Sequence, residues 1–296
     1  MKVLLTGASG QLGRILSRAV PDGVELIPCS RNELDLSDAQ ACGSAVQRHH
    51  PDWVLNAAAY TAVDRAEAEP ELAMAVNAAG PAALAAALAQ TGGRLLQIST
   101  DFVFSGRQGS PWRPEQTVEP LGVYGASKAA GERAALALPG ARVLRTSWLH
   151  GPVGRNFCRT MLRLHGARSA AGEPLPVVAD QVSCPTATHT LARACWRAIG
   201  VGADPDGPRI LHWSDDGVAS WYDFALAIGE LGSAAGLIAA AAEVYPIPTS
   251  RYPTAARRPS FSLLDCATSR QALGLRGIHW RNALAAVLSE IAGGSG

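Results

Sequence analysis

A tyrosine and a lysine four residues apart, Tyr124 and Lys128, have the types and the spacing needed for proton transfer. On a helix their side chains would share one face, one turn apart. An unperturbed phenol ionises at about pH 10, and a nearby ammonium favours the phenolate. Tyr124 could then pass its proton to a carbonyl oxygen as hydride reaches the carbon, while Lys128 holds the cofactor ribose. The hydroxyl of Thr100 could bridge that oxygen and Tyr124, so these three residues form the predicted catalytic group.

A glycine-rich loop near the N-terminus indicates where the hydride donor binds. Gly7, Gly10 and Gly13 form a GxxGxxG pattern between the apolar run Lys2–Thr6 and a predicted helix that begins at Gln11. The three glycines permit a tight turn, a close approach of the backbone to a pyrophosphate, and close helix–strand packing. The free N–H groups of the helix N-terminus would bind the phosphates. The pattern therefore predicts a dinucleotide site.

The residues after the second predicted strand favour NADPH, with NADH still possible. A site for NAD usually places Asp or Glu there for the ribose 2′-hydroxyl. Here Ser30 and Arg31 offer a hydroxyl and a guanidinium, which suit a 2′-phosphate. Asp35 could accept from the adenine amino group, with Leu36 against the ring. Two alternatives stay open: Arg31 could be an ordinary surface residue, and Asp35 could belong to a helix cap.

The elements that must position these residues alternate through the first 150 residues. Apolar runs predict strands at Lys2–Thr6, 24–28, Trp53–Asn56, 94–99 and 141–146. Helices are predicted at 11–20, at 37–49 with Ser37 as the N-cap, at 71–90 and at 121–138. Alternation of this kind is typical of the α/β class and predicts a Rossmann-type doubly wound parallel sheet. Thr100 then falls at the carboxyl edge of the sheet, where such sheets bind ligands.

The alternation loosens in the second half of the chain. Pro, Gly and Trp become frequent, and helices are expected at about 155–166, 188–199, 220–231 and 281–292. We therefore predict an NAD(P)-binding Rossmann domain over residues 1–150 and a smaller C-terminal α/β substrate-binding domain over 151–296. The boundary is approximate, because strands of the second domain could return to the main sheet.

The composition excludes several classes of protein. With 26 Lys plus Arg against 25 Asp plus Glu, the net charge of +1 offers no basic surface for nucleic acid. The N-terminal apolar run is too short for a secretory signal, and the Ala-rich stretches 82–89 and 234–242 are not expected to span a membrane. Six scattered cysteines without a CxxC pair argue against zinc and disulfides. We expect a cytoplasmic protein with no nucleic-acid or membrane partner.

Taken together, the motifs resemble the extended short-chain dehydrogenase/reductase family and, more narrowly, the dTDP-4-dehydrorhamnose reductases. The resemblance spans nearly the whole chain and is carried by segments 7–13 (GASGQLG), 56–64 (NAAAYTAVD), 99–104 (STDFVF), 123–128 (VYGASK), 144–148 (LRTSW), 180–186 (DQVSCPT) and 257–265 (RRPSFSLLD). It implies reduction of the 4-keto group of dTDP-4-dehydro-L-rhamnose by NAD(P)H. The nucleotide-sugar product, dTDP-L-rhamnose, would supply cell-surface polysaccharide.

The resemblance also implies roles for single residues. Tyr124 would be the proton donor, Lys128 its partner and Thr100 the group that tunes it. The cofactor would be lined by Gln11, Leu12, Asp35, Leu36, Ala59, Tyr60 and Thr61. The sugar would meet Thr100, Asp101 and Trp148, with Val63 nearby. An indole suits the apolar face of a sugar, although a tryptophan at a strand end is often a core residue.

The ligands of a magnesium site found in some members of the family are missing from this sequence. Some relatives dimerise through a magnesium ion held by carboxylates just after the glycine loop and just after the Pro-Thr pair. Here those stretches read 14–16 (RIL) and 187–190 (ATHT), without a carboxylate, whereas magnesium requires oxygen ligands. We therefore expect no metal, and either a monomer or a metal-independent homodimer.

Two other functions stay open. One is an epimerase or 4,6-dehydratase of the same fold. A dehydratase, however, needs an Asp-Glu pair after the threonine, whereas here Thr100 is followed by Asp101 and Phe102, so the glutamate is missing. A non-catalytic regulatory subunit is the other. Such proteins often lose the tyrosine or the lysine, and both are present here.

Overall fold

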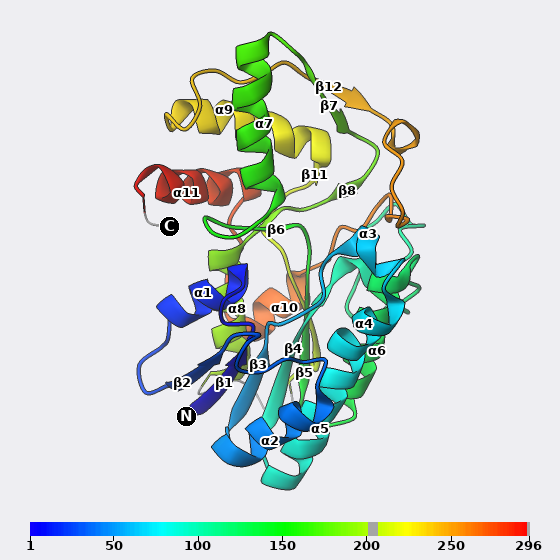
Figure 1. Ribbon diagram of the computed structural model, residues 1–296, viewed down its shortest axis with the longest axis vertical. Helices are drawn as coiled ribbons and strands as arrows, with labels where there is room; N and C mark the ends of the chain where they lie inside the picture. Colours follow the sequence, from blue (N-terminus) through cyan, green and yellow to red (C-terminus); the bar gives the residue numbers. More distant parts are fainter. Residues whose placement is uncertain (201–206, 295–296) are drawn as a thin grey trace.

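A six-stranded parallel sheet forms the centre of the molecule in the computed structural model, which describes residues 1–200 and 207–294. Its strands are β1 (Lys2–Thr6), β2 (Glu25–Cys29), β3 (Trp53–Asn56), β4 (Arg94–Thr100), β5 (Arg142–Thr146) and β10 (Ile210–Trp213). They lie in the order β10-β5-β4-β3-β1-β2, and every neighbouring pair is parallel. The predicted doubly wound α/β fold is confirmed (Figure 1).

Helices cover both faces of this sheet. On one face lie α1 (Gln11–Arg18), α8 (Thr188–Ile199) and α10 (Ala267–Leu273); on the other lie α2 (Ala39–His49), α5 (Gly80–Thr91) and α6 (Val123–Leu136). Within β1, Val3 and Leu5 belong to the first core and Leu4 to the second. A strand buried on both faces needs apolar residues at every position, which explains the continuous apolar run of β1.

The helix before β4 differs from its prediction. It consists of α4 (Pro70–Met74), a π-helical segment η1 (Ala75–Ala79) and α5, and it follows the short helix α3 (Val63–Ala66). In η1 the buried Asn77 accepts from the backbone N–H of Tyr60 at 2.9 Å and donates to the Ser127 hydroxyl at 3.0 Å. The π-helical turn therefore occurs where the Asn77 side chain connects the loop after β3 to helix α6.

One smaller expectation is corrected here. The N-cap of α2 is Asp38, whose carboxylate accepts from the backbone N–H of Ala41, whereas Ser37 donates to Asp35. The helix Pro70–Thr91 is long and apolar enough to cross a bilayer by length and composition alone. Half of its apolar window is buried, and Leu84 and Leu88 pack in the core beside the sheet, as in the core helix of a globular protein.

Part of the second half of the chain forms an upper layer in Figure 1, with helices α7 (Phe157–Ala171), α9 (Trp221–Ala234) and α11 (Trp280–Ala292). Its strands pair as β6 (Leu149–His150) with β9 (Thr186–Ala187), β7 (Leu175–Val178) with β12 (Val244–Ile247), and β8 (Val182–Ser183) with β11 (Ala219–Ser220). Two short 3₁₀ turns, η2 (Asp101–Val103) and η3 (Thr249–Arg251), complete the elements. Because α8, β10 and α10 return to the main sheet, the division near residue 150 stays an approximate prediction.

Candidate active site

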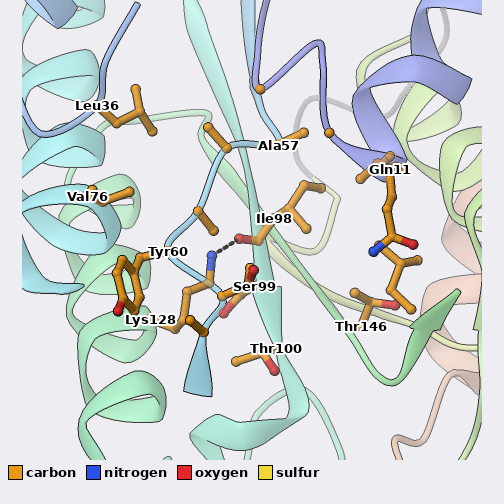
Figure 2. Close-up of a pocket in the computed structure, with 18 of the residues that line it drawn as sticks. Gln11, Leu36, Ala57, Tyr60, Val76, Ile98, Ser99, Thr100, Lys128 and Thr146 are labelled. Carbon is orange, nitrogen blue, oxygen red and sulfur yellow. Dashed lines mark hydrogen bonds between the residues drawn. The ribbon is translucent and has the colours of Figure 1, made fainter. Parts of the chain in front are cut away.

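A cavity of about 650 Å³ lies at the carboxyl edge of the sheet, beneath the upper layer. The predicted site residues that line it come from many separate segments: Gly7, Gly10, Gln11, Leu12, Arg31, Asp35, Leu36, Ala59, Tyr60, Thr61, Thr100, Tyr124, Lys128 and Trp148. Figure 2 shows Gln11 and Leu36 on opposite sides of it, with Thr100 on strand β4 and Lys128 of helix α6 reaching towards that strand. The fold therefore brings most of the predicted cofactor and catalytic residues to one cavity.

The glycine loop leaves room for a phosphate group because side chains are excluded from it. Gly7 has φ +69°, and a Cβ there would lie 2.8 Å from the backbone of Ala58. A Cβ on Gly13, which packs beneath the loop, would lie 2.1 Å from the carbonyl oxygen of Gly7. Helix α1 begins directly afterwards at Gln11, so its free N–H groups face the same turn. This geometry fits a dinucleotide pyrophosphate.

The pocket end near β2 carries one exposed cation. The Nε atom of Arg31 donates to Asp35 at 3.2 Å, and Asp35 also accepts from the backbone N–H and the hydroxyl of Ser37. The hydrogen bonds from Ser37, and then Arg31, hold the pKa of Asp35 below its usual value. Asp35 therefore stays ionised and anchors Arg31 through a single nitrogen, which leaves the terminal guanidinium nitrogens for a phosphate.

Ser30 does not take the place that the sequence predicted. It lies outside the cavity lining, and its backbone N–H donates to Glu33 at 2.7 Å. Hydrogen bonds from Ser30 lower the pKa of Glu33. The hydroxyl expected to bind the 2′-phosphate with Arg31 thus faces the carboxylate of Glu33. Residue types alone did not reveal this local contact.

The phenol of Tyr124 keeps its proton in this site. Burial raises its pKa to about 12, the negative charge of Asp101 acts in the same direction, and the hydrogen bond with Thr100 opposes them. The sequence predicts that Lys128 favours the phenolate, whereas burial dominates the pKa of Tyr124 in the structure. A protonated phenol at the cavity wall is the state required of a proton donor.

Lys128 is buried and held against strand β4. Its Nζ atom donates to the carbonyl oxygen of Ile98 at 2.6 Å, as the dashed line in Figure 2 shows. Burial lowers its pKa to about 8, while the negative charge of Glu132, one turn along α6, raises it. The ammonium is therefore fixed at the cavity wall and remains charged near neutral pH.

A buried ion pair supports this part of α6. Arg145 of β5 binds Glu132 through two nitrogens at 2.8 and 2.7 Å, and both side chains are at most 4% exposed. A third nitrogen of Arg145 donates to the carbonyl oxygen of Pro114 at 3.1 Å. Sequence reasoning missed this pair: Arg145 stands in the segment 144–148 (LRTSW), but no spacing in the sequence connects it to Glu132.

Asp101 does not face the cavity, although it was expected to meet the sugar. It is 2% exposed, and its carboxylate accepts from the hydroxyls of Ser262, Ser183 and Thr100, the last at 3.1 Å. Burial raises its pKa to about 7. The 3₁₀ turn after β4 directs this side chain under the upper layer, so only its neighbour Thr100 lines the cavity.

Two further predicted substrate residues line different hollows, and Tyr124 lines both of these. Val63 lines a small hollow that it shares with Tyr124 and Phe102. Trp148 lines the large cavity, and its ring stacks on that of Trp221 with centroids 3.5 Å apart. Sequence reasoning missed Trp221, because no motif connects the start of α9 to the end of β5.

No cluster of three or more His, Cys, Asp or Glu side chains suited to a metal ion occurs within residues 1–200 and 207–294. At the face where α8 meets α11, the ring of His189 lies 2.9 Å from a carboxylate oxygen of Glu290. Arg18 lies 3.5 Å from the other oxygen of that carboxylate. Glu290 thus has an arginine and a histidine side chain beside it.

The chain is similar to known proteins over almost its entire length. The profile of the family described as "RmlD substrate binding domain" matches residues 1–292. A dTDP-4-dehydrorhamnose reductase of Aggregatibacter actinomycetemcomitans is 39% identical over 289 residues, which cover 96% of this chain and 97% of that protein.

Solved structures agree with that comparison. The crystal structure of a dTDP-4-dehydrorhamnose reductase from Clostridium acetobutylicum has a TM-score of 0.88 at 36% identity, covering 97% of this chain and 98% of that one. A dTDP-4-dehydrorhamnose reductase from Bacillus anthracis, in complex with NADP, has a TM-score of 0.87 at 32% identity, covering 98% and 99%. The chain belongs to the RmlD family.

Proposed function

We propose that this protein reduces the 4-keto group of dTDP-4-dehydro-L-rhamnose with NADPH and releases dTDP-L-rhamnose. The observation that carries the proposal is the protonated phenol of Tyr124 in a cavity that also contains a glycine-lined phosphate cradle. Relatives named dTDP-4-dehydrorhamnose reductase support the choice of substrate. A relative's structure in complex with NADP supports the choice of cofactor.

The cofactor half of the site would work through the strands β1 to β3. Gly7, Gly10, Gln11 and Leu12 surround the pyrophosphate, with Gly13 packed beneath them. Arg31 reads the 2′-phosphate, while Asp35 and Leu36 receive the adenine. Ala59, Tyr60 and Thr61, held by Asn77, line the ribose side. When bound, NADPH supplies the hydride.

The catalytic half would complete the reduction. Tyr124 donates its phenolic proton to the sugar O4 as the C4 carbon receives hydride, so a carbonyl becomes a hydroxyl and Tyr124 is left as a phenolate. The ammonium of Lys128 beside it stabilises that negative charge, and the Thr100 hydroxyl tunes it. Trp148 supports the sugar ring, Val63 closes the opposite side, and Asp101 acts from beneath through Thr100.

The two parts of the chain would bind different ligands. Residues 1–150 together with β10 would bind the cofactor, and most of 151–296 would bind the sugar nucleotide. All six cysteines of the described residues are free, which fits the cytoplasm. We propose a monomer or a metal-independent homodimer that binds neither nucleic acid nor membrane.

The test is a coupled assay of cofactor and product. Purified protein mixed with dTDP-4-dehydro-L-rhamnose should consume NADPH and yield one dTDP-L-rhamnose for each NADPH oxidised, as measured by absorbance and chromatography. Sugar conversion without net NADPH oxidation would favour the epimerase or dehydratase alternative. Cofactor binding without conversion would favour the regulatory one.

A further inference from the structure

Trp148 has a backbone conformation that tryptophan rarely adopts. Its φ is +43°, in the left-handed region, which is a genuine outlier for a bulky side chain. Such conformations persist only where the surroundings hold them, and they concentrate at binding and catalytic sites. The residue stands between β5 and β6, and it lines the large cavity. The conformation therefore indicates that the orientation of this indole is important for binding in the cavity.

A second indole holds the first in place. The rings of Trp148 and Trp221 are stacked with centroids 3.5 Å apart and planes inclined by 9°. Phe157 contacts the Trp221 ring at a centroid distance of 4.6 Å. Near-parallel contact over two large rings buries one face of Trp148, while the residue as a whole remains half-buried at the cavity wall.

Trp221 is itself fixed at both ends. Its backbone begins α9, where Ser220 and Asp223 form a reciprocal capping box that sets the helix start. Its indole N–H donates to the side-chain oxygen of Gln181 at 3.1 Å, and the Gln181 amide donates to the Thr249 hydroxyl at 3.0 Å. A ring anchored through both its backbone and its N–H is a rigid support, so it can impose one orientation on the ring stacked against it.

We propose that Trp221 is a positioning residue for sugar specificity: it holds the Trp148 indole in its left-handed conformation as the wall that receives the hexose of the nucleotide sugar. This inference rests on the proposed function. The chemistry recognised is an apolar face of C–H groups, which an indole contacts well. Gln181 contributes by fixing Trp221, and it lies outside the cavity lining.

The experiment compares Trp221→Ala and Trp148→Ala, singly and together. We expect Trp221→Ala to raise KM for dTDP-4-dehydro-L-rhamnose by ~3- to 10-fold, the scale of an aromatic pair, with a smaller change in kcat and no change in the Kd of NADPH. Because Trp221 acts through Trp148, the double variant should be no worse than Trp148→Ala alone. Trp221→Phe, which keeps an aromatic face, should recover part of the loss.

A spectroscopic measurement follows the pair without substrate. Stacked indoles couple their electronic transitions, so the wild-type protein should show an exciton couplet in its far-ultraviolet circular dichroism. Each single alanine variant should lose that couplet. The matched control is Trp280→Phe, because Trp280 lies in the same apolar cluster as Trp221 but lines a different hollow. This control should keep the couplet and the wild-type KM.

Several results would overturn the inference. They are an unchanged KM in Trp221→Ala, additive effects in the double variant, an equal rise in the Kd of NADPH, or the same rise in KM in Trp280→Phe. Binding of dTDP-L-rhamnose, measured by calorimetry, separates the two proposals. A wild-type protein that neither binds this nucleotide sugar nor oxidises NADPH refutes the proposed function, and with it the role of Trp221. An active wild type with an unaffected Trp221→Ala refutes only the inference.

Discussion

At the scale of single residues, the proposed reaction depends on one phenolic hydroxyl. Burial keeps Tyr124 protonated, so replacing it by Phe removes the proton and leaves the ring. Tyr124→Phe should lower kcat by ~100-fold or more, the usual effect of losing a general acid. The Kd of NADPH, measured by fluorescence titration, should be nearly unchanged. Turnover close to that of the wild type would exclude Tyr124 as the proton donor.

A substitution of Arg31 should affect the binding of NADPH and NADH differently. Its side chain is 72% exposed and held by Asp35 through one nitrogen, and only NADPH carries a 2′-phosphate for the remaining nitrogens. Arg31→Ala should weaken NADPH binding by ~10- to 150-fold, since a hydrogen bond to a charged group contributes ~1.5–3 kcal/mol. NADH binding should hardly change. Equal losses for both cofactors would assign Arg31 to the ordinary surface.

The buried ammonium of Lys128 sets an expected pH dependence. Its pKa in the folded protein is about 8, well below the 10.5 of an unperturbed lysine, so the positive charge is lost as the pH rises through about 8. We expect kcat/KM to fall above that pH. The fall is not unfolding, because a folded pKa below the unfolded one adds stability as the pH rises from 8 towards 10.5.

The control for that titration is Lys128→Met, which removes the charge while keeping the length of the side chain. Its residual kcat/KM should be low and should lack the decline near pH 8. A decline retained in Lys128→Met would belong to another group.

At the scale of elements, the ion pair between Glu132 on α6 and Arg145 on β5 should be highly sensitive to substitution. Both side chains are almost fully buried, so Glu132→Ala leaves an uncompensated cation in the core. We expect the free energy of unfolding to fall by ~3–5 kcal/mol in urea denaturation. Glu230→Ala, which breaks an exposed pair with Arg281, should change it by about 0–1 kcal/mol. Similar losses in both variants would contradict this account.

The elements also show what the sequence could predict. The strand Trp53–Asn56 was placed correctly because its first three residues form an apolar run, as expected where a strand is buried on both faces. The choice of Asp38 over Ser37 as N-cap, and the π-helical segment around Asn77, depended on tertiary hydrogen bonds. No local pattern encodes such bonds, so these details could not be predicted from the sequence.

At the scale of the whole molecule, predictability falls where contacts join distant segments. The glycine loop and the Tyr124–Lys128 pair are local patterns, and the structure places both at one cavity. The stack of Trp148 on Trp221 and the burial of Asp101 under Ser262 arise only when the upper layer closes on the sheet. Strands of two to four residues in that layer are too short for their alternating hydrophobic pattern to be recognised.

The last prediction concerns metal and assembly. We expect EDTA to change neither activity nor the mass measured by light scattering. The proposed chemistry needs no Lewis acid, because Tyr124 supplies the proton and Lys128 the positive charge. At the face where α8 meets α11, Glu290 already contacts His189 and Arg18, so a dication would have to displace both side chains to gain one carboxylate.

The matched control for this prediction is Glu290→Gln, which removes that carboxylate while keeping its size. Its mass in solution should equal that of the wild type, with or without EDTA. A homodimer held by apolar contact would survive both treatments. A chelator-induced change from dimer to monomer, abolished in Glu290→Gln, would instead show that Glu290 binds a metal shared between two copies of the chain.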